Sequence, residues 1–175
     1  MKHGIVTLAL LLLTGCVSMP DTYRPPIERK PMLGGNDSDL REFIAMSDPD
    51  AADHILNGIS DKVEAGAWRW TWERFTLKFA LPDTAERKLL IEFTIPAETF
   101  NETGPFHISY SVNGHLLDKV RYDSAGEKRF EKAIQADRLR ANAENIVAAE
   151  LDKVYVAEPD QKKLGVILKR AGFVR

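Results

Sequence analysis

Three tryptophans spaced two residues apart are the side chains in this sequence best suited to stacking on a sugar ring. Residues two apart share a face of a β-strand, so Trp68, Trp70 and Trp72 are expected to point the same way, with Arg69 opposite as a structural ion-pair partner. Large aromatics more often fill a core, so we expect Trp68 and Trp70 to be buried and Trp72 to face solvent. The glycan-binding hypothesis adds Tyr110 to these three tryptophans.

Histidines invite a zinc hypothesis, but their spacing does not favour one. His54, His107 and His115 are far apart in sequence and lack the close spacing that marks a metal site. We expect them to be solvated surface histidines, and we predict no metal site.

A catalytic site is not predicted either. Ser109, Ser111 and Asp118 lie near His107 in the sequence and are residue types found in catalytic triads. No nucleophile elbow surrounds either serine. Glutamates on the expected strands and loops form no recognisable acid–base pair: Glu92, Glu98 and Glu102. The sequence also lacks a glycine-rich phosphate loop, and no cofactor is predicted.

The elements that must position these residues have a period of two. Phe75 to Leu81 and Leu89 to Ile95 alternate apolar with polar residues, and turn residues separate these runs from one another. Short alternating strands at regular spacing favour a sandwich or barrel. The prediction is an all-β chain with a single antiparallel β-sandwich, jelly-roll-like, over residues 51–175.

A hairpin around Asn113-Gly114 allows two registers. A two-residue turn would pair Val112 with His115, whereas a bulged turn with Gly114 in the left-handed conformation would pair Ser111 with His115. The second register places Phe106, Ile108 and Tyr110 on the same face as Leu116, Val120 and Tyr122. Because register decides which face is buried, the sequence favours the bulged turn.

The N-terminal third has a different character. Residues 1–15 have a basic start and an apolar run too short to span a bilayer, which is typical of an export signal. Residues 16–50 are rich in proline and glycine and are expected to be a flexible tether. Within it, Leu40, Phe43 and Ile44 share a helical face, which predicts a short helix near residues 39–46.

The end of the export signal resembles the lipobox of bacterial lipoproteins. Leu13-Thr14-Gly15-Cys16 has the spacing and small residues of that motif, and Cys16 is the only cysteine. The resemblance implies cleavage before Cys16 and palmitate-type acylation of that residue. Two or more acyl chains together give stable anchoring to a membrane. Val17, which is not an aspartate, implies by the same resemblance the outer membrane, with the protein facing the periplasm.

The remainder resembles a recurrent bacterial jelly-roll domain similar to galactose-binding-like sandwiches, which are often appended to envelope glycan enzymes. The resemblance runs over residues 53–173 and is carried by Trp68–Thr71, Ser111–Gly114, Lys163–Val166 and Gly172-Phe173. Such folds host many unrelated functions. The net charge of −2 gives no reason to expect a nucleic-acid partner.

We therefore expect a lipid-anchored envelope protein with a non-catalytic binding or scaffolding module, and glycan binding is the sharper hypothesis within that class. The alternatives are an accessory protein that binds another envelope protein by the sandwich edge or the Leu40–Met46 segment, or an enzyme acting on envelope glycans.

Overall fold

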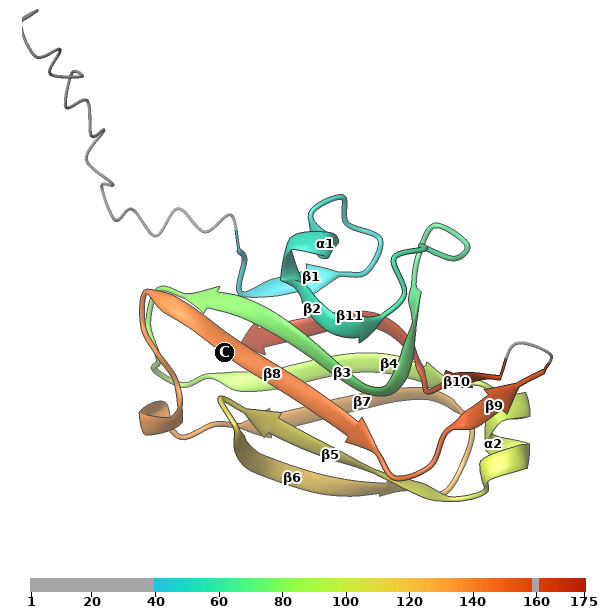
Figure 1. Cartoon of the computed structure of the whole chain (residues 1–175). Coiled ribbons are helices and arrows are strands. Elements are labelled where there is room, and N and C mark those ends of the chain that lie inside the picture. The colour runs from blue at the N-terminus through green and yellow to red at the C-terminus, as the bar shows by residue number, and fades with distance from the viewer. Residues whose placement is uncertain (1–39, 159–160) are drawn as a thin grey trace, which may run out of the picture. The chain divides into compact units, whose positions relative to one another are not determined.

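The computed structural model describes residues 40–158 and 161–175 (Figure 1). The predictions for the signal peptide, for Cys16 and for the tether as far as residue 39 lie outside this range. The elements, in chain order, are β1 (Phe43–Ala45), α1 (Ala51–His54), β2 (Ile55–Ile59), β3 (Arg69–Leu81), β4 (Lys88–Ile95), α2 (Ala97–Thr103), β5 (Phe106–Val112), β6 (His115–Tyr122), β7 (Gly126–Ala133), the 3-10 helix η1 (Ala136–Arg138), β8 (Ala143–Leu151), β9 (Tyr155–Ala157), β10 (Lys162–Leu164) and β11 (Ile167–Val174).

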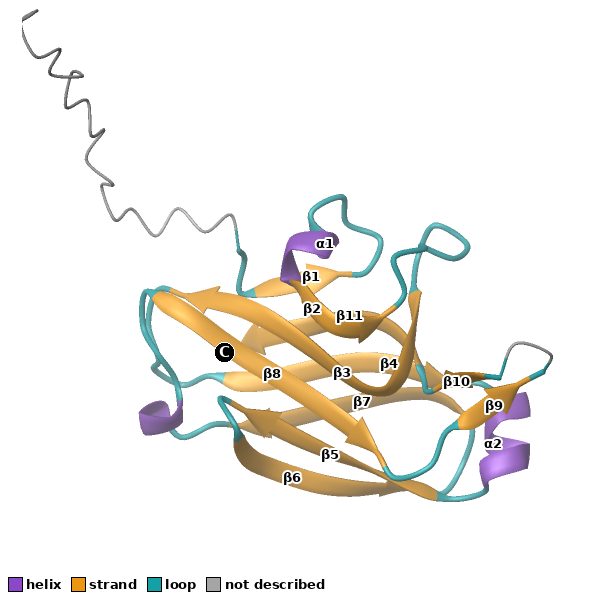
Figure 2. Ribbon diagram, in the orientation of Figure 1, coloured by secondary structure: helices purple, strands orange, loops and turns teal. Residues whose placement is uncertain are grey.

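Two antiparallel layers form a sandwich, which confirms the predicted fold class. One layer has the order β1-β11-β4-β7, and the other has the order β2-β3-β8-β5-β6. Strand β3 joins the layers because its first residues, Arg69 and Trp70, pair with β11 while Arg74 to Leu81 pair with β8. The few helices are short and lie at the margins of the sheets (Figure 2).

The core lies between the layers and follows the period of two. Every second residue of β4, of the second half of β3 and of β5 is almost completely inaccessible to solvent. These residues are Leu89, Ile91, Phe93 and Ile95 in β4, Phe75, Leu77, Phe79 and Leu81 in β3, and Phe106, Ile108, Tyr110 and Val112 in β5. None of the helices in the described ranges has the length and apolar character that a bilayer-spanning helix needs.

The predicted short helix near residues 39–46 is wrong. Residues Phe43–Ala45 form strand β1, which pairs with β11 from Arg170 to Gly172. Ile44 and Met46 point into the core with exposed fractions of 1% and 0%. A partner strand more than 120 positions further along the chain therefore overrides the local helical spacing, and these residues belong to the sandwich.

The register predicted for the hairpin is also wrong, although Gly114 has the expected positive φ of 82°. Asn113 has a positive φ of 49° as well, and Val112 pairs with His115, so the turn has two residues. The extra residue lies further along β6, where Leu117 falls between the pairs Ser111–Leu116 and Tyr110–Asp118.

This bulge restores the predicted face for most of the hairpin. Ile108 is opposite Val120 and Phe106 is opposite Tyr122, so these residues share a face as the sequence predicted, although the predicted register would have placed Phe106 opposite Val120. Leu116 lies before the bulge and is the exception, because its side chain is 62% exposed.

Candidate functional site

The three tryptophans lie on the outer face of β3 and its approach. Trp72 is 41% exposed, as predicted, while Trp68 and Trp70 are only half-buried, so the prediction that these two are core residues is wrong. The reason is the period of two. The odd-numbered residues of β3 from Phe75 to Leu81 point into the core, and the even-numbered residues Trp70, Trp72 and Arg74 lie on the opposite, more exposed face.

Local contacts hold Trp68 and Trp70 in place. Trp68 and Trp70 pack edge to face, with ring centroids 5.9 Å apart and an interplanar angle of 86°. The carbonyl of Trp68 accepts a hydrogen bond from the Glu64 amide at 2.8 Å, and that of Trp70 accepts one from the Ser60 amide at the same distance. The segment before β3 is thus hydrogen-bonded to the strand that carries the tryptophans.

The connection between β10 and β11 packs directly against the main chain beneath Trp72. A Cβ atom at Gly165 would lie 2.5 Å from the Trp72 carbonyl oxygen and 2.8 Å from Thr71 Oγ1. No residue larger than glycine fits there without moving the backbone. This close approach brings β10 alongside the indole.

Two polar side chains replace the usual apolar ones on the inner face at this end of β3. Buried Arg69 donates hydrogen bonds to the carbonyls of Met46, Ser60 and Asp61, rather than pairing with a carboxylate as predicted. Thr71 Oγ1 donates to the Val166 carbonyl and accepts from its amide. A buried polar group is tolerated when it is hydrogen-bonded, and these groups tie four segments together.

Trp72 lies between two surface hollows. One, of about 500 Å³, includes Ser60, Lys62 and Trp70 in its lining, and the other, of about 410 Å³, includes Arg74 and Lys163. The exposed indole lines both hollows and offers an apolar ring face. Lysine, arginine, carboxylate and hydroxyl groups around it can donate or accept hydrogen bonds.

Tyr110 does not belong to this site, and its assignment as a glycan-binding residue is wrong. Its side chain is 0% exposed, it stacks on Phe130 with ring centroids 3.7 Å apart, and its hydroxyl lies 2.8 Å from that of Tyr122. Burial, with the neighbouring Tyr122 as a second cause, raises the pKa of Tyr110 well above its ordinary value. Tyr110 is an inward residue of β5 and serves the core.

His54 is buried rather than solvated, which corrects the prediction for this histidine. Its Nδ1 lies 2.9 Å from the Lys78 carbonyl, and its Nε2 accepts the Arg41 amide hydrogen at 3.3 Å. Burial lowers the pKa of His54, so the neutral ring with a proton on Nδ1 fits both contacts. In the part of the chain that the structure describes, no three histidine, cysteine or acidic side chains are placed to hold a metal ion.

His107 pairs with a carboxylate that the sequence did not group with it. Its Nδ1 lies 2.9 Å from Asp152 Oδ2, and its amide donates to Asp152 Oδ1 at 2.7 Å. Asp118 instead pairs with Lys132 at 2.8 Å. Asp118 therefore does not pair with His107, and His115 is exposed as expected.

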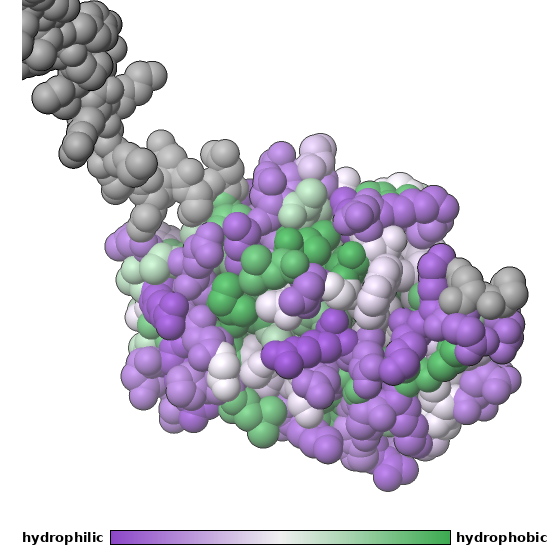
Figure 3. Space-filling model, in the orientation of Figure 1, coloured by the Kyte–Doolittle hydropathy of each residue, from purple (hydrophilic) through white to green (hydrophobic). Residues whose placement is uncertain are grey.

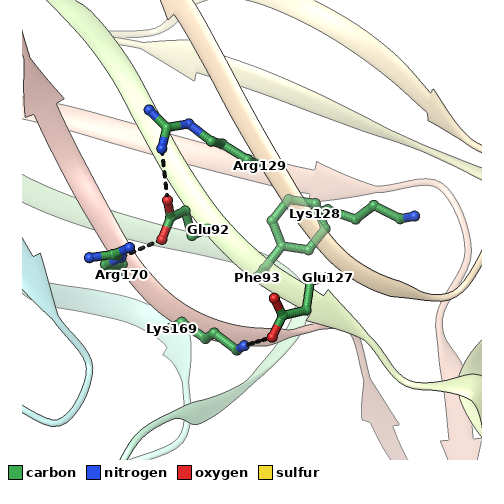
Figure 4. Close-up of a pocket in the computed structure, with 7 residues that line it drawn as sticks. All are labelled: Glu92, Phe93, Glu127, Lys128, Arg129, Lys169 and Arg170. Atoms are coloured by element: carbon green, nitrogen blue, oxygen red, sulfur yellow. Dashed lines mark hydrogen bonds and ion pairs between the residues drawn. The ribbon is translucent and has the colours of Figure 1, made fainter.

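A charged hollow of about 450 Å³ lies over β4, β7 and β11 (Figure 4). Glu92 binds Arg129 at 3.2 Å and also binds Arg170, while Glu127 binds Lys169. The dashed lines in Figure 4 show that these side chains point toward one another across strands. Their chemistry suits cross-linking of three strands, because each carboxylate is held by at least one cation.

Sequence reasoning missed the polar residues around Trp72. The β9-β10 hairpin supplies Lys162 and Lys163, β3 supplies Arg74, and β8 supplies Glu150. Arg74 was within reach of the sequence, because it shares the parity of the tryptophans. The others come close only through pairings that a local pattern does not contain.

Comparisons with known proteins find similarity to solved structures only. No protein-family model matches the chain, and no curated protein matches it. A family 35 carbohydrate binding module from Clostridium thermocellum has a TM-score of 0.43 and 13% identity, covering 70% of this chain and 92% of that one.

Two further solved structures give similar values. Xyl-CBM35 in complex with a glucuronic acid containing disaccharide has a TM-score of 0.44 and 9% identity, covering 76% of this chain and 92% of that one. An acetyl xylan esterase, Est2A, from the rumen bacterium Butyrivibrio proteoclasticus has a TM-score of 0.45 and 11% identity, covering 78% of this chain and 34% of the esterase. Carbohydrate-binding modules are among the solved structures to which this chain is similar.

Proposed function

We propose that this chain is a lipid-anchored cell-envelope protein whose β-sandwich is a non-catalytic glycan-binding module. The observation that carries the proposal is the outward orientation of the tryptophan row. Trp72 is 41% exposed between two hollows, although a large aromatic normally adds stability when it is buried. An exposed aromatic ring among hydrogen-bonding groups is the arrangement expected of a small-molecule site.

The supporting residues hold the strand that carries Trp72. Trp68 and Trp70 are half-buried and pack against each other, and Thr71 and Gly165 fix the strand from below. A strand held in this way needs little rearrangement of its backbone when a ligand stacks on the indole. The pyranose ring presents an apolar face to such an indole while its hydroxyls reach the polar rim.

The direct test is glycan binding by wild-type protein and a Trp72→Ala variant. A glycan array and affinity electrophoresis in polysaccharide gels should show binding by the wild type and at least a tenfold loss in Trp72→Ala, equivalent to about 1.4 kcal/mol. Leu116→Ala is the matched control, because Leu116 is an exposed apolar residue at 62% on another strand. Equal binding by Trp72→Ala and Leu116→Ala would refute the assignment of the site.

The anchor is part of the same proposal and depends on the sequence. The lipobox-like residues 13–16 support acylation of Cys16, and Val17 supports the outer membrane with the module facing the periplasm. A module tethered in this way would keep its bound glycan close to the membrane.

The two alternative functions have narrower support. For protein binding, a hollow near the start of the sandwich is lined by Leu40, Ile55 and Leu56 together with charged residues, and Leu56 is 47% exposed. Figure 3 shows hydrophobic residues gathered near the middle of this face within a hydrophilic surround. For catalysis, the carboxylates Glu92 and Glu127 of the charged hollow are each ion-paired with cations.

A further inference from the structure

The position of Trp72 between its hollows suggests how a glycan would lie in the site. The first hollow extends from the indole toward Ile59, Ser60 and Leu164, and the second extends toward β8. Both fall within the range of about 300–1,000 Å³ that is usual for small-molecule sites. A sugar stacked on the indole would therefore have room for a neighbour on each side.

Charges in the first hollow are balanced. Its lining contains two lysines, Lys62 and Lys162, and two carboxylates, Asp61 and Glu64. Lys62 is ion-paired with Glu64 at 2.8 Å. An acidic sugar would meet as many carboxylates as lysines there.

The second hollow is balanced in the same way. Lys163 is ion-paired with Glu73 at 3.2 Å, and Arg74 with Glu150 at 3.8 Å. Both ion pairs are well exposed, so water and salt screen their charges. They therefore offer hydrogen-bonding groups without a strong electrostatic field. Neither hollow offers the excess of cations that would favour an anionic ligand.

Resting on the proposed function, we infer that the site binds an internal segment of a neutral, linear glycan. One pyranose stacks on Trp72, and the adjoining sugars enter the two hollows. The charged pairs recognise hydroxyl groups, because a carboxylate accepts and an ammonium or guanidinium group donates. The ligand would thus be recognised along its length rather than at one end.

Chain length and ionic strength test this inference directly. Isothermal titration of the full chain would use chito-, cello- and xylo-oligosaccharides of one to six sugars, with oligogalacturonates as the acidic comparison. For at least one neutral series, affinity should rise at least tenfold between one sugar and four and then level off. It should change less than twofold between 0.15 M and 1 M NaCl, because a neutral ligand has no charge to screen.

One variant for each hollow tests the two-sided geometry. Lys62→Ala and Lys163→Ala remove side chains that are 74% and 60% exposed, so both proteins should fold, which thermal melting would check. Each should weaken binding of the neutral tetrasaccharide three- to tenfold. Lys132→Ala is the control, since Lys132 is a 49% exposed, ion-paired lysine outside both hollows, and its affinity should be unchanged.

The outcomes separate this inference from the proposed function. An effect of only one hollow variant, a monosaccharide that binds as tightly as the hexasaccharide, or tighter binding of oligogalacturonates would overturn the internal, neutral ligand while leaving glycan binding intact. If no neutral or acidic oligosaccharide binds, or if Trp72→Ala binds as wild type does, the proposed function itself fails.

Discussion

Strand β1 provides a sharp test of where the folded domain begins. Ile44 is 1% exposed and packs in the core, and the backbone of β1 pairs with β11. The Met46 amide donates to the Lys169 carbonyl at 2.8 Å, and the Glu42 carbonyl accepts the Phe173 amide at 2.7 Å. We expect Ile44→Ala to destabilise the whole sandwich, not a separate N-terminal segment.

The expected magnitude follows from burial. Replacing a fully buried isoleucine with alanine costs about 2–5 kcal/mol, through lost transfer free energy and the cavity left behind. A domain of this size has a total stability of about 5–15 kcal/mol. A chain that begins at Asp50 should lose more, because it also lacks buried Met46 and the Glu42 partner of Arg87, whose own side chain is 2% exposed.

Urea denaturation followed by tryptophan fluorescence measures these differences. Leu56→Ala is the matched control, since Leu56 is 47% exposed, and it should change the free energy of unfolding by less than about 1 kcal/mol. If the chain beginning at Asp50 unfolds cooperatively at the wild-type urea midpoint, β1 contributes nothing to the domain and the reasoning from its burial is wrong.

Three other predictions concern the anchor, the pH dependence and the core. Cys16→Ser should abolish incorporation of labelled palmitate, and incorporation equal to wild type would rule out a lipoprotein. Burial lowers the pKa of His54 from 6.5, so the unfolded chain binds the proton more readily and stability should fall as pH drops below about 6.5. His54→Gln should flatten that fall in melts between pH 7.5 and 5, whereas the same change at exposed His115 should not. Tyr110→Phe should cost about 1 kcal/mol or more in urea melts by leaving the Tyr122 hydroxyl without its partner, and should leave glycan binding unchanged.

The fold class could be predicted because the strands with the clearest alternation are also the centre of the core. Leu89 to Ile95 and Phe75 to Leu81 place their odd-numbered residues inward as their apolar pattern requires. Strand β1 could not be predicted in this way. Its three residues are too few to show a period, and its pairing with β11 depends on residues at the other end of the chain.

The hairpin shows a different limit. Asn113-Gly114 suits a two-residue turn with positive φ at both positions, and that is the turn observed. The argument from apolar faces correctly required one extra residue in the hairpin, but it placed that residue in the turn, whereas the structure has it at Leu117 in β6. A bulge at either place puts Val120 and Tyr122 on the face of Phe106 and Ile108, so these residues alone do not choose between the two positions.

Placement of the tryptophans was within reach of the sequence. The odd-numbered residues of β3 are buried from Leu81 to Phe75 and again at Thr71 and Arg69, with exposed Glu73 as the exception. By this alternation the tryptophans fall on the face opposite Phe75. The general preference of large aromatics for the core outweighed this local parity and led to the wrong face for Trp68 and Trp70. At this end of β3 the alternation of residues between the two faces predicts the orientation better than residue type does. Arg69 and Thr71 can lie on the inner face because each has a hydrogen-bond partner there.

Those inward polar residues connect the core to the candidate site. Arg69 Nη1 donates to the carbonyls of Ser60 at 3.2 Å and Asp61 at 2.8 Å, and both of these residues line the first hollow beside Trp72. Thr71 holds Val166, next to the glycine that lies under the Trp72 carbonyl. The reversal of polarity that places indoles outside and a guanidinium inside therefore also fixes the walls around the exposed indole. A site preorganised in this way requires little rearrangement on binding, which is the condition under which an exposed ring and a few hydrogen bonds can hold a sugar.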